Sequence, residues 1–518
     1  MNSNITILKI TPFGFVFELE NDSCYFTSEY DIYINGVFHS RTDKNIVSVF
    51  SLKCDTEYEV LISDMLFTVK TLKPKFVINV KDYNATGDGK TCDTSAINLA
   101  IYTAPAGAVI YIPKGVYLVD QLLLKSNVDI YLEKGAVLAQ NTNRAKLGIL
   151  KGLQKNFDHT GAEINASWEG HPLDCYCSVI YGNNIENVHI YGAGTIDGNG
   201  DRGDFWINPK MKNKAFRPKN IFLVECNNIE ISGIISKNSA SWNIHPFYSD
   251  NIILRSLKVE SIETSPNTDG INPESCKNVE IVGCHFSVGD DCIAIKAGKY
   301  YMSKTLLRPC ENIRIHNCYM EKGHGGVVLG SEMSCGIKNV KVSQCLFNET
   351  DRGLRIKTRR GRGNHAVVDG IIFSNVTMQK VLHPIVVNMY YNCDPDGKSD
   401  YVRSKKAHIA DEFTPSIKNI TVSHVTATDV SGCAIFIYGL PESMVAGVRI
   451  EDSMFYFAKK RIAECPAMMD DFVPIENLGI YINNAIDITI KNIICEGIPE
   501  AFSLKNGSAE GDCPLIFS

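Results

Sequence analysis

The sequence contains no long hydrophobic run and no excess of basic residues. No stretch of about 18 apolar residues occurs among its 518 residues, so we expect no transmembrane helix. Lys and Arg number 52 against 58 Asp and Glu, and the net charge of −6 argues against nucleic acid or an acidic membrane as partner. The first residues, MNSNITILKITPFG, show no basic segment followed by an apolar one, so we expect no signal peptide.

Cysteine is abundant, with 18 residues, yet no Cys-x-x-Cys pair occurs, which argues against a zinc site. Without an export signal, this number of cysteines indicates reduced thiols rather than a disulfide framework. We therefore expect a cytoplasmic protein without a metal ion or other cofactor. The composition, 44% hydrophobic and 21% charged, is that of a chain that buries a large core.

Residues 1–74 alternate apolar and polar residues in short segments such as GFVFELE and EYEVLI. Period-2 alternation between turn-forming residues predicts a small antiparallel β-sandwich. The run Leu52, Cys54, Thr56, Tyr58 resembles the tyrosine corner of fibronectin type III modules. Lys73-Pro74-Lys75 is the expected boundary, although these strands could instead form only a cap on the domain that follows.

From residue 75 to residue 518 the sequence is repetitive. Ten copies of one short unit begin at Asn187, Asn228, Asn251, Asn278, Asn312, Asn339, Gly370, Asn419, Gly447 and Asp487. Strand-only units that recur every 20–40 residues predict a parallel β-helix, in which neighbouring coils share one core. An α-helix over residues 93–104, with an Asp or Thr cap, should cover its N-terminal end. Three cysteines at one position of the unit should stack inside as small apolar residues: Cys284, Cys318 and Cys345.

Charged residues recur on what should be consecutive coils of this β-helix. Adjacent coils lie about 4.8 Å apart, so equivalent positions are brought close together. The segments are Asn267-Thr268-Asp269-Gly270, Gly289-Asp290-Asp291-Cys292, Gly323-His324-Gly325 and Arg355-Ile356-Lys357. Each segment alone is typical of a turn or a solvated face. Their joint order predicts one surface strip that carries three carboxylates, an imidazole and two cations.

The four segments NTDG, GDDC, GHG and RIK resemble the signatures of glycoside hydrolase family 28, the polygalacturonases and their relatives. The stretches DYNATGDGKT and YGAGTIDGNG are also similar to that family, and the resemblance covers roughly residues 80 to 500. It implies an all-β fold, a right-handed parallel β-helix, and hydrolysis of α-1,4-galacturonosidic bonds with inversion. A fibronectin-like front domain is similar to that of some bacterial exo-acting members.

The resemblance also implies roles for single residues. Asp290 would be the general acid, while Asp269 and Asp291 would position and deprotonate the water. His324 would help to hold the acid in its protonation state. The binding residues would be Asn267 for a sugar hydroxyl, Arg355 and Lys357 for the galacturonate carboxylate, and Tyr391, with Tyr390 as the alternative.

Three long insertions, residues 142–178, 200–218 and 392–417, should rise as loops around the groove. Loops that close one end would favour release of single terminal residues, so we expect an exo-acting enzyme on oligogalacturonides or polygalacturonate. Arg359, Arg360 and Arg362 would form a basic loop for a polyanionic sugar chain or a plain solvated loop. The alternatives are a hydrolase of rhamnogalacturonan or xylogalacturonan, a calcium-dependent pectate lyase, and a non-catalytic glycan-binding solenoid.

Overall fold

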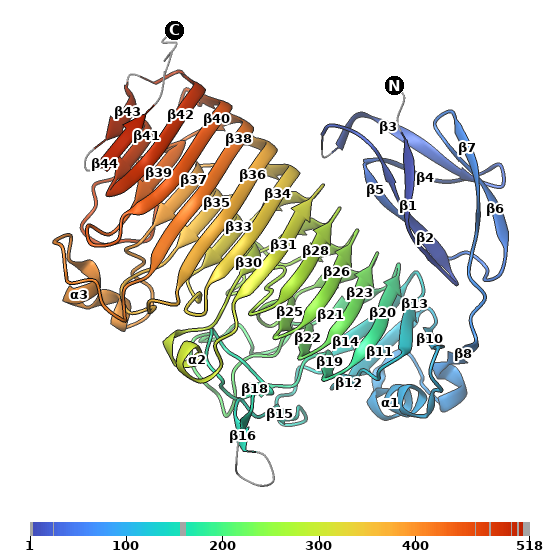
Figure 1. Ribbon diagram of the computed structural model, residues 1–518. Coiled ribbons are helices and arrows are strands. Elements are labelled where there is room, and N and C mark those ends of the chain that lie inside the picture. Colours follow the sequence, from blue (N-terminus) through green and yellow to red (C-terminus); the bar gives the residue numbers. More distant parts are fainter. Residues whose placement is uncertain are drawn as a thin grey trace.

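The structure, a computed structural model, describes residues 4–23, 25–155, 162–460, 463–475, 478–498, 500–504 and 507–510. A long coil of stacked strands forms most of the molecule, and a small β-domain lies beside its N-terminal half (Figure 1). None of the described helices is long and apolar enough to cross a membrane. The predicted fold class is confirmed.

The front domain consists of two antiparallel sheets that enclose a core of their own. The first contains β1 (Ile5–Thr11), β2 (Gly14–Leu19) and β5 (Ile46–Phe50). The second contains β4 (Val37–Lys44), β3 (Tyr25–Ile34), β6 (Glu57–Ile62) and β7 (Met65–Lys70). At the start of β6 the Tyr58 hydroxyl accepts a hydrogen bond from the backbone N–H of Lys53 (2.8 Å), which is the contact expected of a tyrosine corner. The change of architecture falls between Lys70 and Phe76.

The front domain packs against the side of the long coil rather than over its end (Figure 1). Its contact surface includes an apolar cluster in which Phe50 packs with Tyr131 and Tyr191 of the β-helix. Polar contacts also join the two parts, such as the ion pair between Lys9 and Glu230 (2.8 Å). Phe13 stacks on Tyr131 with ring centroids 4.5 Å apart. These strands thus have a core of their own and contact a lateral face of the β-helix.

The long coil is a parallel β-helix with one 22-stranded sheet. The ten predicted repeats are ten of its strands: β20 (Glu186–Gly192), β23 (Asn227–Ser232), β26 (Asp250–Arg255), β28 (Lys277–Val282), β31 (Cys310–His316), β34 (Ile337–Asn348), β36 (Val367–Gln379), β38 (Ser416–Val430), β40 (Val445–Phe457) and β42 (Ala485–Glu496). The others are β8 (Phe76–Asn79), β9 (Asp88–Cys92), β10 (Ala108–Ile112), β11 (Gly115–Val119), β13 (Val128–Leu132), β14 (Ala136–Gln140), β21 (Thr195–Asp197), β24 (Ile235–Lys237), β27 (Lys258–Glu260), β29 (His285–Ser287), β32 (Tyr319–Lys322) and β44 (Gly507–Glu510).

A second face of the β-helix carries the predicted strip of charges. Its seven-stranded sheet contains β30 (Asp291–Ile295), β33 (Gly325–Gly330), β35 (Arg352–Lys357), β37 (His383–Asn388), β39 (Ile435–Tyr438), β41 (Leu478–Asn483) and β43 (Glu500–Leu504). Toward the N-terminus the face continues as β12 (Leu122–Leu123), β19 (Ile180–Asn183), β22 (Ile221–Val224) and β25 (Ile244–Phe247). Short elements occupy the connections: η1 (Val80–Tyr83), α2 (Tyr300–Thr305), η2 (Asp396–Lys398), α3 (Asp400–Arg403), β15 (Ile149–Leu150), β16 (Gln154–Lys155), β17 (Ala162–Glu163) and β18 (Cys175–Tyr176).

The repeated asparagine explains why the coils keep their register. Asn251, Asn278 and Asn312 each have a positive φ, between 54° and 59°, a left-handed turn that Asn tolerates better than most residues. The side-chain amide of Asn312 donates to Asn278 Oδ1 (3.1 Å), and that of Asn278 donates to Asn251 Oδ1 (3.0 Å). Each turn is thereby linked to the turn of the preceding coil.

The interior and the N-terminal end of the coil are as predicted, with one correction. Cys284, Cys318 and Cys345 are all buried in the core. The helix α1 (Thr94–Thr103) covers the first coils and buries part of its apolar face in the same core. However, the carboxylate of Asp93 does not cap the helix, because its two oxygens accept hydrogen bonds from Thr86 and Gly87 of the preceding loop.

Candidate active site

The predicted polar segments lie on consecutive coils of the second face. Asp269 is followed by Ile271, which bridges to Ile293 of β30. In the next pair of coils Asp291 lies opposite Gly325, and Lys357 of β35 lies opposite Gly330. Stacking of coils therefore brings together side chains up to 88 positions apart in the sequence, as the spacing predicted.

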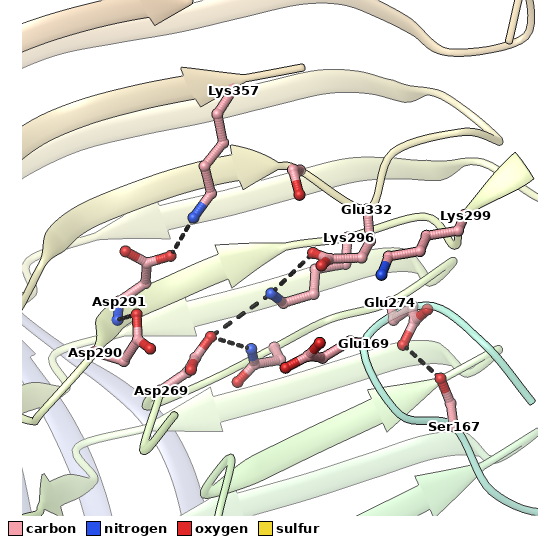
Figure 2. Close-up of polar contacts among 12 residues, drawn as sticks. Ser167, Glu169, Asp269, Glu274, Asp290, Asp291, Lys296, Lys299, Glu332 and Lys357 are labelled. Atoms are coloured by element: carbon pink, nitrogen blue, oxygen red, sulfur yellow. Dashed lines mark hydrogen bonds and ion pairs between the residues drawn. The ribbon is translucent and has the colours of Figure 1, made fainter. Parts of the chain in front are cut away.

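Three carboxylates meet at one point of this face. One oxygen from each of Asp269, Asp290 and Asp291 lies within 4.8 Å of the others. Asp269 and Asp291 are buried, while the side chain of Asp290 is 22% exposed. Figure 2 shows the three side chains directed toward a common space, with lysines on either side of them. The arrangement places two enclosed carboxylates next to a more accessible one.

Asp291 is held in its ionised form. The Lys357 ammonium donates to its Oδ2 (2.8 Å), and the Arg355 guanidinium donates to its Oδ1 (3.4 Å). Burial alone would raise the pKa of Asp291, but Lys357 and Arg355 outweigh it and hold the pKa well below its usual range. Asp291 is therefore a hydrogen-bond acceptor at neutral pH.

The pKa of Asp269 is shifted in the opposite direction. Burial, reinforced by the neighbouring Asp290, raises the pKa of Asp269 to about 7. Lys296 opposes this increase from 3.6 Å, and the side-chain amide of Asn272 donates to Oδ2 (2.8 Å). The second oxygen, Oδ1, is buried without a hydrogen bond among the described residues. Asp269 therefore keeps its proton to a higher pH than an ordinary carboxyl group does.

His324 lies beside the most accessible carboxylate. Its Nδ1 is 3.4 Å from Asp290 Oδ1, and its side chain is 54% exposed. The hydrogen bond to Asp290 raises the pKa of His324 to about 9, so the imidazole is positively charged at neutral pH. A cation therefore faces Asp290 on the solvent side of the cluster.

The remaining predicted residues line the same pocket. Asn267 has a left-handed backbone (φ 55°), and its Oδ1 accepts a hydrogen bond from the buried Arg217 (2.7 Å), which leaves its amide donors toward the pocket. Tyr391 also lines the pocket, with the Lys357 ammonium 5.4 Å from its ring centre. Tyr390, the alternative, is buried beneath the ammonium of Lys405 and does not line the pocket.

The sequence interpretation missed a buried lysine in the centre of the site. Lys296 donates to Glu332 (3.2 Å), lies 3.6 Å from Asp269, and contacts the ring of Trp242 at 4.5 Å. Figure 2 shows its ammonium between the two carboxylates. The indication in the sequence was a lysine within the otherwise apolar run CIAIKAG, because a buried charge there requires a partner of opposite sign.

The pocket has a volume of about 260 Å³ and is bordered by all three predicted loops. Loop 142–178, partly outside the described residues, contributes Glu169, loop 200–218 contributes Lys210, and loop 392–417 contributes Asp394. A fourth segment, which the sequence did not suggest, contributes Met468. The loops are joined across the pocket, since Lys210 pairs with Glu169 at 2.6 Å.

Contacts between loops border the pocket next to Glu332 and Asp394. The backbone N–H of Lys299 donates to the carbonyl of Gly170 (3.0 Å), and the Lys299 ammonium pairs with Asp394 (3.1 Å). We call this junction of Gly170, Lys299 and Asp394 the closed end. Glu332 packs directly against it, because a Cβ on Gly170 would lie 2.8 Å from Glu332 Cγ.

The predicted basic loop is wrong. Arg359, Arg360 and Arg362 are buried and pair with carboxylates of the chain itself. Arg360 binds both oxygens of Glu442, and Arg359 and Arg362 both contact Asp394. These guanidinium groups fasten the connecting loops to the β-helix, so they form neither a sugar-binding surface nor a solvated loop.

The acidic cluster could in principle attract a divalent cation, since its oxygens are close together. The surrounding cations oppose this. Asp291 is paired with Lys357 and Arg355, and Lys296 faces Asp269. These ammonium and guanidinium groups already supply the positive charge that a metal ion would bring. Their presence disfavours binding of a divalent cation by the three carboxylates.

A larger open depression of about 570 Å³ lies over the turns of β34 to β42. It brings no group of three metal-binding or acidic side chains together among the described residues. The smaller pocket is therefore the better candidate for an active site.

Comparisons with known proteins point to one family. The model of glycosyl hydrolases family 28 matches residues 103–470. A probable polygalacturonase of Vitis vinifera is 31% identical over 387 residues, which cover 73% of this chain and 74% of the relative. An exo-poly-alpha-D-galacturonosidase of Dickeya chrysanthemi is 27% identical over 442 residues, covering 76% and 71%. The solved exopolygalacturonase of Yersinia enterocolitica shares the fold, with a TM-score of 0.69 at 19% identity over 100% of this chain and 97% of that one.

Proposed function

Since the chain belongs to family 28 of the glycosyl hydrolases, we propose that it hydrolyses α-1,4-galacturonosidic bonds of polygalacturonate or its oligomers and acts on the chain end. The observation that carries the proposal is the meeting of Asp269, Asp290 and Asp291 in one pocket that also holds Arg355 and Lys357. Hydrolysis of a glycosidic bond requires a protonated carboxyl group and a carboxylate that activates water.

The three carboxylates divide this work. Asp290 protonates the glycosidic oxygen of the leaving group, and the exposed His324 beside it stabilises the carboxylate that remains. Asp291, kept ionised by Lys357, and Asp269 hold the water and accept its proton. Water attacks the face opposite the leaving group, so the configuration at the anomeric carbon inverts.

The binding residues fit an acidic sugar. Arg355 and Lys357 together carry two positive charges next to the single carboxylate of Asp291, so they can also bind the carboxylate of a galacturonate. Asn267 donates to a sugar hydroxyl, and Tyr391 packs against the ring from the side of Lys357. A neutral sugar at this position, as in some related pectic glycans, would leave one of these two positive charges without a negative partner.

The closed end supports action on chain ends. The junction of Gly170, Lys299 and Asp394 lies on the Lys296 side of the cluster, whereas Asp290 and His324 lie on the exposed side. The leaving group therefore extends toward solvent, and the residue that is cut off occupies the enclosed part of the pocket. This arrangement supports the removal of single residues from the non-reducing end. The relative from Dickeya chrysanthemi is named as an exo-acting enzyme.

The test is digestion of a defined galacturonate pentamer, with product sizes followed over time and the anomeric form followed by NMR. Monomer from the outset and a β product support the proposal. A ladder of intermediate lengths would refute the exo action, and an α product would refute inversion. A calcium-dependent lyase would instead lose activity with a chelator and produce absorbance near 235 nm from an unsaturated product, and a binding protein would release nothing.

We also propose that the front domain is a fibronectin type III-like module and that the protein is cytoplasmic. The module is supported by its three- and four-stranded sheets and by the Tyr58 corner. The location is supported by the thiols, since the cysteines that the structure describes include many free ones, such as Cys284, Cys292 and Cys345. Cell fractionation with activity measured in each fraction tests the location, and activity outside the cytoplasm would refute it.

A further inference from the structure

Glu332 is an enclosed carboxylate that borders the pocket without belonging to the catalytic group. It follows β33, its side chain is 11% exposed, and it packs against the closed end. Its Oε2 accepts a hydrogen bond from Lys296 (3.2 Å). Within the described part of the chain its other oxygen, Oε1, has no hydrogen bond and is not fully buried. One acceptor oxygen is therefore available to a ligand.

Glu332 is ionised in this setting. Burial favours the neutral acid, but Lys296, Lys299 and Arg362 outweigh it and hold the pKa of Glu332 below its usual range. An ionised carboxylate only accepts hydrogen bonds. It repels the carboxylate of an acidic sugar, so the group of the substrate that meets Oε1 must be a hydroxyl.

The position of Glu332 in the pocket indicates which hydroxyl of the sugar it contacts. Glu332 lines the same pocket as the three aspartates and lies next to the closed end. Figure 2 shows it on the far side of Lys296 from Asp290. A sugar whose leaving group lies at Asp290 therefore directs its opposite edge, which carries the 4-hydroxyl, toward Glu332.

We propose that Glu332 recognises the free 4-hydroxyl of the terminal galacturonate and so limits cleavage to chain ends. Only the non-reducing terminal residue has this hydroxyl, because O4 of every internal residue carries the next sugar and has no hydrogen to donate. An internal residue would leave Glu332 without its partner and would press the next sugar against the closed end. The inference rests on the proposed exo-hydrolysis and identifies Glu332 as the residue that recognises the chain end.

The test compares two trigalacturonates, one natural and one with a 4-deoxy residue at the non-reducing end. The deoxy sugar keeps its chair form and carboxylate and lacks only the hydroxyl. A hydrogen bond to a charged group contributes about 1.5–3 kcal/mol, so the wild-type kcat/KM should fall about 10- to 100-fold on the deoxy substrate. In Glu332→Met, which keeps the length and cannot accept this bond, the two substrates should be cleaved at nearly equal rates.

A matched control separates recognition from a general disturbance of the pocket. Glu169→Gln removes another carboxylate of the pocket wall, on a different loop, and should retain the preference for the natural substrate. Should Glu332→Met fail to fold, as judged by circular dichroism, the isosteric Glu332→Gln should still reduce the preference by about tenfold.

The inference is overturned if wild type cleaves both substrates equally, or if the folded Glu332 variant keeps the wild-type preference, or if the preference is lost in Glu169→Gln instead. These outcomes differ from failure of the proposed function, in which wild type would release no galacturonate from the natural trimer.

Discussion

Replacement of Lys296 by methionine should move the acidic limb of the activity profile to higher pH. Asp269 accepts a proton from the attacking water only in its ionised form, and it loses its own proton as the pH rises through its pKa of about 7. Lys296 stabilises the ionised form of Asp269 from 3.6 Å, so its removal makes loss of the proton harder. The sign of the shift is therefore upward.

The size of the shift follows from the same distance. Two unit charges 3.6 Å apart interact by about 4–5 kcal/mol at an effective dielectric constant of about 20. One pKa unit corresponds to about 1.4 kcal/mol, so we expect an upward shift of up to about 3 units.

The assay is the pH profile of kcat/KM between pH 4 and pH 9 on a galacturonate oligomer. The double variant Lys296→Met with Glu332→Gln is the matched control, since it restores the net charge of the pocket. Its acidic limb should lie nearer that of wild type. An acidic limb in Lys296→Met at the wild-type pH or below it, with the fold intact, would refute the assigned role of Lys296.

Three further predictions test the chemistry, the loops and the closed end. Asp290→Asn should lower kcat by about 10²- to 10⁴-fold without a change in melting temperature, and near-normal turnover would exclude Asp290 as the acid. Arg360→Met should lower the free energy of unfolding by about 3–5 kcal/mol in urea titration, because the buried Glu442 would lose its partner, whereas an unchanged midpoint would contradict that role. Gly170→Ala should release products longer than the monomer, because a Cβ there would lie 2.9 Å from a backbone nitrogen of the opposite loop. Gly361→Ala, also at positive φ but with open space, should leave the product pattern unchanged.

The sequence predicted the β-helix because each coil repeats the same short pattern of turn-forming and apolar residues. The unit that begins at Asn278 contains a residue suited to a left-handed turn followed by alternating apolar positions, and the structure uses both. Because coils stack at a fixed spacing, the order of Asp269, Asp291 and Lys357 along the chain became proximity in space. Local pattern and regular stacking were sufficient for the fold and for the position of the charged strip.

The sequence did not predict the roles of Arg360 and Lys296. Each role depends on an ion-pair partner that no local sequence pattern identifies. Arg360 looked like part of a basic surface, but its partner Glu442 lies 82 residues further along the chain. Lys296 lies in an apolar run of the sequence, but its partners Glu332 and Asp269 belong to other coils. Such pairs are made by loops of irregular length, and loop paths follow from tertiary contacts rather than from spacing.

The proposed function has two parts, cleavage of the bond and selection of the bond to be cleaved. The regular coils carry the first part, and the irregular loops carry the second. The coils fix Asp290 and Asp291 at the ends of stacked strands, where bond cleavage depends on positions that a rigid sheet maintains. The loops decide which bond is presented, since the closed end is built by Gly170 and Asp394 from insertions outside the repeat. A loop change can therefore alter where the sugar chain is cut while the acid and the water-activating pair stay in place. This separation predicts that product length and turnover respond to different sets of substitutions.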